Sequence, residues 1–350
     1  MYNQLTNFWV VLLIGGLFQV SAFAETGTAV EEGIFDLMEV AKPLDLTLTT
    51  DLEILRNDRF FDGSTQGSLE FVDKYGNRQL WPIKVKLRGN FRRMHCADIP
   101  PLKIKFKKSD LQEAGLAPFN DFKLVTQCVA NEQQARDYIK REYLAYKMYN
   151  EVSEKSFRVQ LLRITFVDTR TNMTFHQLAF VIADTAQMRA RLGAKKIKEI
   201  YNIPQERFDQ EELRKLAVFQ YAIGNSDWSL QTSRNLKMIE IDGKVFAIPY
   251  DFDFSGLVNA SYASGNSSWE MGNVRERIYM GFRESKSNLE EAIYLMKTLE
   301  PALVSTIKKE KGVGLLNKWY VQKYLKSFYE DLPNFQFGKR RPVQVVSYPR

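Results

Sequence analysis

The chain has 350 residues, of which 45% are hydrophobic and 26% are charged, a composition typical of a globular protein. Its two histidines and two cysteines are too few for most zinc sites built from Cys and His, and they leave little choice for a Ser-His-Asp triad. The 49 basic and 42 acidic residues give a net charge of +7, which favours an anionic ligand. Because the basic residues are dispersed and the sequence contains no recognition module for nucleic acid, we expect no nucleic-acid partner.

The amino terminus has the pattern of an export signal. Residues 1–24 contain no charged side chain, and the apolar run from Phe8 to Val20 is shorter than the roughly 20 residues that span a bilayer. Ala22 and Ala24 then form an A-x-A cleavage pattern. We expect residues 1–24 to be a signal peptide and the mature protein to be periplasmic, on the cell surface or secreted, with no stable membrane span after cleavage. A buried N-terminal helix and an uncleaved anchor are the alternatives.

The expected export affects the oxidation state of the two cysteines. Disulfides form in oxidising compartments, so Cys96 and Cys128 are a possible disulfide pair. The alternative is two unpaired thiols, because one pair in a large domain is not a disulfide framework.

The first part of the mature chain, residues 25–184, is rich in predicted strands. Leucines alternate with polar residues over 44–49, and turn residues at 73–77 and 168–172 each separate two strand-like runs, which predicts two hairpins. Apolar residues at helical spacing over 131–151 predict one helix inserted among these strands.

The pattern becomes mostly helical after Asp184. Helices are predicted over residues 185–192, 209–223, 288–310 and 314–331. We therefore expect an α+β protein with a strand-rich N-terminal lobe (25–184) and a helical C-terminal lobe (185–335). Residues 336–350 form a basic tail beyond it.

A hairpin in the second part carries the strongest local signal. Asp242 and Gly243 lie between two strand-like runs, and an Asp-Gly pair in this position favours a two-residue turn. Such a turn pairs Ile241 with Lys244. The same register places Asn235 opposite Tyr250.

This register brings acidic and amide groups together. Opposed residues of antiparallel strands lie about 4.5–5.5 Å apart. Asn235 therefore lies beside Asp251, with Asp227 in the preceding loop and Asp253 just below. Such carboxylates repel one another unless a cation or a proton lies between them, and oxygen ligands of this kind favour Mg²⁺ or Mn²⁺ that meets phosphate oxygens. The alternative is that these residues only cap turns.

A helix, a loop with Asp, then Asn, a hairpin and a second Asp follow one another as in the catalytic segment of protein-kinase-like folds. The chain resembles the spore coat protein H (CotH) family of secreted, atypical kinases, and more remotely the HipA-like kinases. The resemblance rests on Arg88-Gly89-Asn90, Pro101–Phe106, Arg141–Tyr146, Gly224–Trp228, Asn235 and Ile248–Asp253. It implies a two-lobed, protein-kinase-like fold.

The resemblance also implies roles for the acidic residues. Asp227 would be the catalytic carboxylate that orients or deprotonates the acceptor hydroxyl. Asn235 and Asp251 would hold Mg²⁺ or Mn²⁺ on the phosphates of ATP, and Asp253 would be a second or outer ligand.

A strand lysine would contact the phosphates in such a protein. Lys103 and Lys105 share one face of a strand, so the spacing does not choose between them; we favour Lys105, which precedes Phe106. Glu142 would hold this lysine from the inserted helix. The alternatives are a solvated edge strand for the lysines and a surface helix for the glutamate.

Arg88, Gly89 and Asn90 resemble the segment that replaces a glycine-rich phosphate loop in this family. Glycine lets backbone N–H groups approach an anion, and arginine adds a bidentate donor. An ordinary turn at the end of a strand would have the same sequence.

The expected function is that of a metal-dependent, CotH-type kinase that moves the terminal phosphate of ATP to a protein hydroxyl outside the cytoplasm. A glycan is the alternative acceptor. A catalytically inactive, kinase-like surface or secreted binding module is the competing function, and nucleotidyl transfer at the same site is a third.

Overall fold

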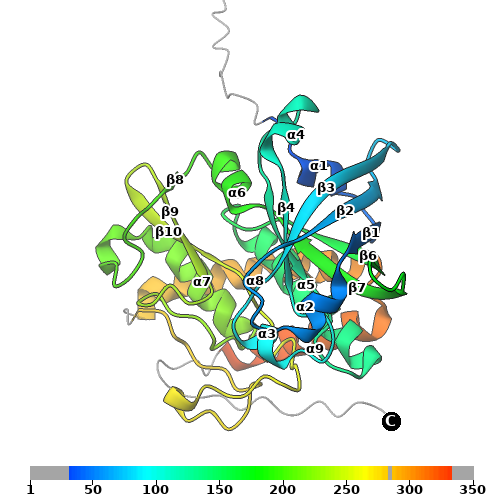
Figure 1. The fold of residues 1–350 in the computed structure, drawn as a ribbon. Coiled ribbons are helices and arrows are strands. Elements are labelled where there is room, and N and C mark those ends of the chain that lie inside the picture. Colours follow the sequence, from blue (N-terminus) through cyan, green and yellow to red (C-terminus); the bar gives the residue numbers. More distant parts are fainter. Residues whose placement is uncertain (1–30, 283–285, 333–350) are drawn as a thin grey trace, which may run out of the picture. The chain divides into compact units, whose positions relative to one another are not determined.

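A computed structural model describes residues 31–282 and 286–332 of the chain (Figure 1). These residues belong to one compact unit that begins at Glu31. The signal peptide expected over residues 1–24 and the basic tail expected over 336–350 lie outside the described residues.

A barrel of seven strands is the main element of the described ranges, with the order β1-β2-β3-β4-β5-β7-β6. The strands are β1 (Leu44–Thr50), β2 (Thr65–Val72), β3 (Arg78–Leu87), β4 (Leu102–Phe106), β5 (Asp121–Val125), β6 (Val159–Asp168) and β7 (Thr174–Ile182). Both predicted hairpins are confirmed, since β2 pairs with β3 and β6 with β7, each antiparallel. The leucines of β1 alternate as predicted and point into the barrel.

The remaining strands form a small separate sheet with the order β10-β9-β8. They are β8 (Lys195–Lys196), β9 (Leu236–Ile241) and β10 (Lys244–Pro249). The short helices are α1 (Ile34–Met38), α2 (Leu52–Asn57), α3 (Phe91–His95), α4 (Lys108–Glu113) and α6 (Thr185–Arg191). The longer ones are α5 (Glu132–Val152), α7 (Gln210–Ala222), α8 (Lys286–Lys309) and α9 (Leu315–Asp331), close to their predicted bounds.

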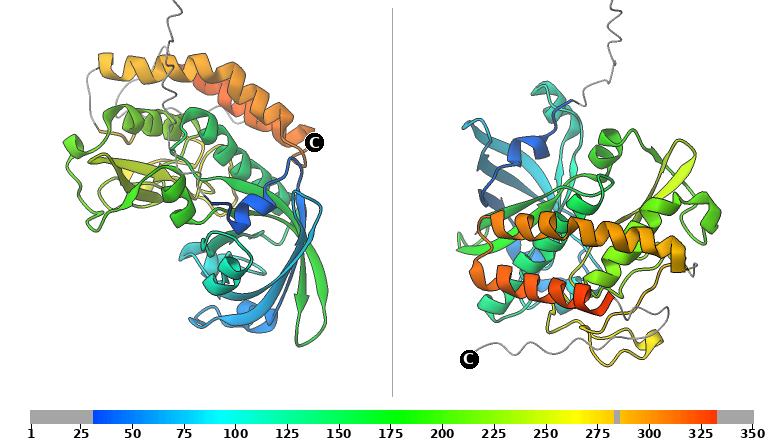
Figure 2. Two further views of the ribbon diagram at one scale, coloured as in Figure 1. Left: turned by 90° about the horizontal axis from the view of Figure 1, so that it is seen from above. Right: turned by 180° about the vertical axis from the view of Figure 1, so that it is seen from behind.

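Two hydrophobic clusters form the core. One fills the barrel, where Leu48, Val85, Leu124 and Phe166 are fully buried. The other surrounds α5 and joins it to α7, α8, α9 and the β9–β10 hairpin. Figure 2 shows α8 and α9 running side by side, with α5 between them and the barrel. Each fully buried Leu or Phe contributes about 1.5–3 kcal/mol, so both clusters stabilise the unit substantially.

The expected two-lobed, protein-kinase-like fold is wrong, although the α+β class is right. The strands close on themselves because β1 pairs in parallel with β6, with Leu46 opposite Ile164. Alternating leucines indicate which face of a strand is buried, but they carry no information about a partner so far away in the chain.

The boundary expected at Asp184 falls at the start of α6. The Asp184 carboxylate accepts a hydrogen bond from the N–H of Ala186 at 2.7 Å, which caps that helix. It also accepts from the N–H groups of Asn120 and Asp121, at 2.9 Å each, at the start of β5. The residue therefore ties the barrel to the segment that follows it. Among the described helices, none combines the length and apolar character needed to cross a membrane.

Candidate metal and phosphate site

The β9–β10 hairpin sets the frame of the site. Its register is the predicted one, with Ile241 opposite Lys244. At the far end of the hairpin, the N–H of Tyr250 donates to the carbonyl oxygen of Asn235 at 3.0 Å. The predicted juxtaposition of these two residues is confirmed.

The backbone turns sharply on both sides of that end. Asn235 has a φ of 53° and Asp251 a φ of 66°, in the left-handed region that Asn and Asp tolerate better than most residues. The N–H of Asp251 donates to the hydroxyl of Tyr146 at 2.8 Å, which fixes this turn against α5. Backbone strain of this kind concentrates at functional sites.

Asp227 and Asn235 form one hydrogen-bonded unit. The side-chain nitrogen of Asn235 donates to the Asp227 carbonyl oxygen at 2.6 Å and to its Oδ2 at 3.0 Å. Arg234 lies 3.4 Å from the other carboxylate oxygen. Burial raises the pKa of the Asp227 carboxyl above its usual range; Arg234 opposes this shift and Asp251 adds to it. Because Nδ2 of Asn235 is engaged, only Oδ1 of that amide could ligate a cation.

Three carboxylates meet below this unit. Glu142 of α5, Asp251 and Asp253 each offer one oxygen, and the three oxygens lie within 4.8 Å of one another. Among the described residues, Oε1 of Glu142 is buried without a hydrogen-bond partner, and Oδ2 of Asp253 has no hydrogen bond but an ion pair with Nε of Arg92, 3.5 Å away. Buried carboxylate oxygens without donors are costly, and a hard divalent cation would satisfy them. The donor set therefore fits Mg²⁺ or Mn²⁺, with Glu142 joining the predicted Asp251 and Asp253.

Arg92 of α3 lies against the same cluster; the sequence indicates only that Arg92 adds positive charge beside Asn90, and its contact with the carboxylates was not predicted. Its Nη1 is 3.3 Å from Oε2 of Glu142, and its Nε is 3.5 Å from Oδ2 of Asp253. All three side chains are buried. Three carboxylates and one guanidinium sum to −3 + 1 = −2 when all are ionised, so a divalent cation would balance the cluster.

Burial also controls the protonation of this cluster. It raises the pKa of Glu142 to about 8, against the opposing charge of Arg92, and the nearby Asp253 and Asp251 add to the shift. Burial raises the pKa of Asp253 to about 6, again opposed by Arg92. Without a metal ion the cluster retains a proton near neutral pH, and a bound cation would have to displace it.

A cavity of about 410 Å³ opens above the cluster. Its lining includes the predicted residues Arg88, Gly89, Asn90, Asp227, Asn235, Asp251 and Asp253. Gly89 has a φ of +79°, which favours glycine, and a Cβ there would meet nothing within 4 Å. The structure thus brings the predicted phosphate loop and the predicted acidic residues together at one cavity. Glu142 does not line this cavity, but it contacts two residues that do, Arg92 and Asp253.

The two candidate strand lysines lie elsewhere. Lys103 is paired with Asp121, with 3.0 Å between Nζ and Oδ2. Lys105 is exposed and lines a separate pocket together with Lys84 and Lys107. In the described part of the chain, neither lysine lines the cavity, and the ion pair of Glu142 is with Arg92 and not with either lysine.

Two other lysines approach the site, Lys123 of β5 and Lys237 of β9, whose Nζ lies 5.2 Å from the ring centroid of Tyr250. Nζ of Lys123 lies closer, 4.6 Å from the ring centroid of Tyr250, a cavity residue, and 4.9 Å from that of Phe157. This nitrogen is buried and has no hydrogen-bond partner among the described residues. Burial lowers the pKa of Lys123 to about 7, with help from the positive charge of Arg88. The sequence did not predict Lys123 as a site residue. It lies directly opposite the predicted Lys103 in the pairing of β4 with β5.

The disulfide between Cys96 and Cys128 holds the loop that carries Arg92. Cys96 ends α3, and Cys128 follows β5. Beside the bond, the N–H of Ala97 donates to the carbonyl oxygen of Cys128 at 2.8 Å. The cross-link therefore fixes α3, and with it Arg92, against the barrel.

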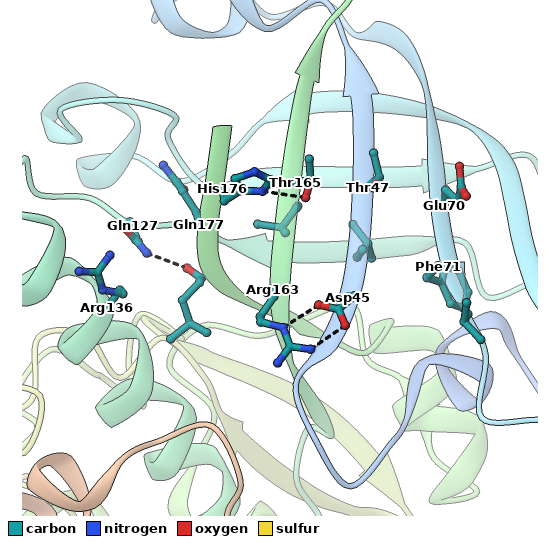
Figure 3. A pocket seen from close by; sticks show the side chains of 14 residues that line it. Asp45, Thr47, Glu70, Phe71, Gln127, Arg136, Arg163, Thr165, His176 and Gln177 are labelled. Atoms are coloured by element: carbon teal, nitrogen blue, oxygen red, sulfur yellow. Dashed lines mark hydrogen bonds and ion pairs between the residues drawn. The ribbon is translucent and has the colours of Figure 1, made fainter. Parts of the chain in front are cut away.

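A second cavity, of about 680 Å³, lies on the sheet formed by β2, β1, β6 and β7 (Figure 3). Figure 3 shows Arg163 and Asp45 pointing at each other, and Arg163 donates two hydrogen bonds of 2.6 Å to Asp45. His176 shares a hydrogen bond of 2.9 Å with the hydroxyl of Thr165. These groups satisfy each other, so this cavity offers a weaker basis for chemistry than the acidic one.

Comparison with known proteins adds no assignment to this site. No model of a known protein family matches the chain, and no curated protein matches it either. The resemblance to CotH-type kinases therefore stays a prediction based on short motifs.

Proposed function

We propose that the protein is a metal-dependent phosphotransferase that moves the terminal phosphoryl group of ATP to a protein hydroxyl outside the cytoplasm. The observation that carries the proposal is the convergence of the Asp227–Asn235 unit, the three-carboxylate cluster and Arg88 at one cavity. Phosphoryl transfer needs positioning and charge neutralisation more than covalent chemistry, and this set of groups supplies both. A glycan hydroxyl is the alternative acceptor.

The acidic cluster is the proposed cation site. Asp251, Asp253 and Glu142 would hold Mg²⁺ or Mn²⁺, and Oδ1 of Asn235 would be a further ligand. The bound ion would neutralise charge on the phosphate oxygens of the nucleotide. Oε1 of Glu142, buried and without a hydrogen-bond partner among the described residues, is the best support for this assignment, because it needs a cation or a proton.

The phosphates would lie between this cluster and the basic groups of the barrel. Arg88 can donate two hydrogen bonds to a phosphate, and the open backbone at Gly89 allows close approach of an anion. Nζ of Lys123 lies over the ring of the cavity residue Tyr250 without a hydrogen-bond partner among the described residues, and a nearby phosphate would favour its charged form.

Asp227 is the proposed catalytic carboxylate. Its raised pKa suits a group that accepts the proton of the acceptor hydroxyl while the oxygen bonds to phosphorus and the bond to the ADP oxygen breaks. Asn235 holds this carboxylate through Nδ2, which makes it a positioning residue for Asp227 as well as a possible cation ligand. The disulfide is compatible with an oxidising compartment, which supports the proposed export.

Transfer of labelled phosphate from ATP, labelled at its terminal phosphate, tests the proposal. The purified chain with Mg²⁺ or Mn²⁺ should phosphorylate itself or an added protein. Asp227→Ala and Asp251→Ala should each abolish transfer, while the exposed Asp62→Ala leaves it unchanged. Melting curves would show that the variants are folded. Transfer that persists in either site variant would remove the assignment.

A non-catalytic binding module is the second candidate. The observation in its favour is that Arg92 already supplies one positive charge to the carboxylate cluster. Binding without chemistry would show as stabilisation by ATP and Mn²⁺, about 2.7 kcal/mol at a ligand concentration one hundred times Kd, with no labelled product. Intact mass of any modified product would distinguish phosphoryl from nucleotidyl transfer.

A further inference from the structure

An exposed apolar tip begins helix α9. Leu315 is 85% exposed, Leu316 48% and Trp319 43%, and we call these three residues the α9 tip. The following turns of the same helix bury Tyr320 and Tyr324 in the core. The helix therefore has an ordinary packed face, while its first two turns present large apolar side chains to solvent. Exposed apolar clusters of this kind mark interaction sites.

Lysines surround the α9 tip. Residues 308–323 contain five lysines and one glutamate, a net charge of 5 − 1 = +4. The glutamate, Glu310, lies 3.3 Å from Lys147 of α5 and accepts a hydrogen bond from Tyr143, so its charge is compensated within the protein. Lys323 lies over the ring of Trp319, with its Nζ 5.0 Å from the centroid. The surface around the tip is thus basic.

The tip is firmly attached to the rest of the unit. Asn317, between Leu316 and Trp319, accepts a hydrogen bond from Arg141 at 2.9 Å and donates one to Asp137 at 2.6 Å. Both partners are on α5, the helix that also carries Glu142. A partner bound at the tip would therefore be held at a fixed position relative to the acidic site.

We propose that the α9 tip docks the protein on an anionic lipid bilayer. Leu and Trp side chains are those that enter the interfacial region of a membrane, and lysines beside them attract anionic head groups. The three side chains are exposed to solvent by 43–85%, which suits insertion into lipid. Docking does not depend on the proposed phosphotransferase activity; if both are right, acceptors on the same membrane would be brought close to the site.

Vesicle binding by the full chain tests this proposal. Binding to vesicles of phosphatidylglycerol and phosphatidylcholine should exceed binding to phosphatidylcholine alone. Changing the three tip residues together to serine should weaken binding at least about tenfold, because the inserted apolar area is lost. A control variant, with three other exposed apolar residues, Phe60, Leu80 and Met173, changed to serine, should bind as the unchanged protein does.

Two further measurements separate the tip from other causes. Brominated lipids should quench tryptophan fluorescence, and Trp319→Phe should retain binding but lose most of the quenching. Changing Lys308, Lys309 and Lys311 to glutamate should abolish the preference for anionic vesicles. Equal binding by the tip variant and the control variant would overturn the proposal. Self-association lost only in the tip variant, with vesicle binding unchanged, would assign the tip to a second copy of the chain.

Discussion

The guanidinium of Arg92 lies 3.3 Å from the carboxylate of Glu142, although 50 positions separate the two residues in the chain. Arg92 comes from α3, the short helix after β3, and Glu142 from the middle of the long helix α5. The contact joins the barrel loop to the second core, and its carboxylate is part of the candidate cation site. Because both side chains are buried, neither can exchange its partner for water.

Arg92→Met should make the fold depend on a metal ion. The change leaves the buried carboxylates of Glu142 and Asp253 without their cation, and loss of one partner from a buried ion pair costs about 3–5 kcal/mol of unfolding free energy. Mn²⁺ should restore much of that loss, because it supplies the missing positive charge. Denaturant unfolding in EDTA and in Mn²⁺ measures both effects.

Arg163→Met is the matched control for that experiment. Arg163 pairs with Asp45 on the surface, where an ion pair contributes at most about 1 kcal/mol. The unfolding free energy of the Arg163→Met variant should therefore differ little from that of the unchanged protein and should not depend on Mn²⁺. A metal response as large in Arg163→Met as in Arg92→Met would show that the ion does not act at the cluster.

Stabilisation by metal should increase with pH. The pKa of Glu142 is about 8 in the folded protein against 4.5 for an ordinary Glu, so the folded state holds a proton that the unfolded state has lost between those values. In that window the metal-free protein loses stability as pH rises, because the unfolded state binds fewer protons. A metal ion must displace this proton, so the rise in Tm with Mn²⁺ should be larger at about pH 8.5 than at about pH 5.5.

Thermal melts at both pH values, with and without Mn²⁺, measure this difference. In Glu142→Gln the dependence should flatten, because the proton-binding carboxyl is gone. A response that is equal at both pH values in the unchanged protein would place the ion away from Glu142.

The part of the site that the sequence predicts depends on one local element. The Asp-Gly turn fixes the register of β9 and β10, and this register places Asn235 beside Tyr250 and Asp251. Such a short-range signal sets the register of the hairpin independently of the overall fold. Closure of the barrel through the pairing of β1 with β6 has no local signal, which explains why the expected fold was wrong.

Arg92 and Lys123 were missed for a related reason. Arg92 lies in a five-residue helix, too short to show periodicity, and its sequence neighbours suggest only a basic loop. Lys123 alternates with apolar residues as a surface lysine would. Its burial comes from the rings of Tyr250 and Phe157, which belong to other segments. Burial of a charged group by distant segments cannot be read from the strand that carries it.

Lys123→Met should stabilise the protein and weaken nucleotide binding. The pKa of Lys123 is about 7 in the folded protein against 10.5 for an ordinary Lys, so its charged form is penalised by burial. Removing that cost should raise the unfolding free energy by about 1 kcal/mol, after allowance for lost cation–π contacts. The gain should be largest at and below about pH 7 and should shrink as pH rises toward 10.5, where the unfolded state also loses the proton.

The effect on nucleotide distinguishes Lys123 from the lysine favoured by the sequence. With ATP and Mn²⁺, the rise in Tm should be smaller in Lys123→Met than in the unchanged protein. Lys105→Met should retain the full rise, because Lys105 is exposed in a separate pocket. The opposite result, a loss in Lys105→Met alone, would restore Lys105 as the phosphate ligand.

Loss of the disulfide should affect both stability and the site. Changing Cys96 and Cys128 together to serine opens a link between residues 32 positions apart, which should lower the unfolding free energy by about 2–4 kcal/mol. Because the link fixes α3, Arg92 should be held less firmly against Glu142 and Asp253, and the affinity for Mn²⁺ should fall. Denaturant unfolding and Mn²⁺ titration at a temperature where the variant is folded measure the two effects separately.

Dithiothreitol should reproduce both effects in the unchanged protein and should have no further effect on the double variant. A variant that loses stability but binds Mn²⁺ as tightly as before would show that α3 keeps its place without the cross-link, and that Arg92 is positioned by its carboxylate partners alone.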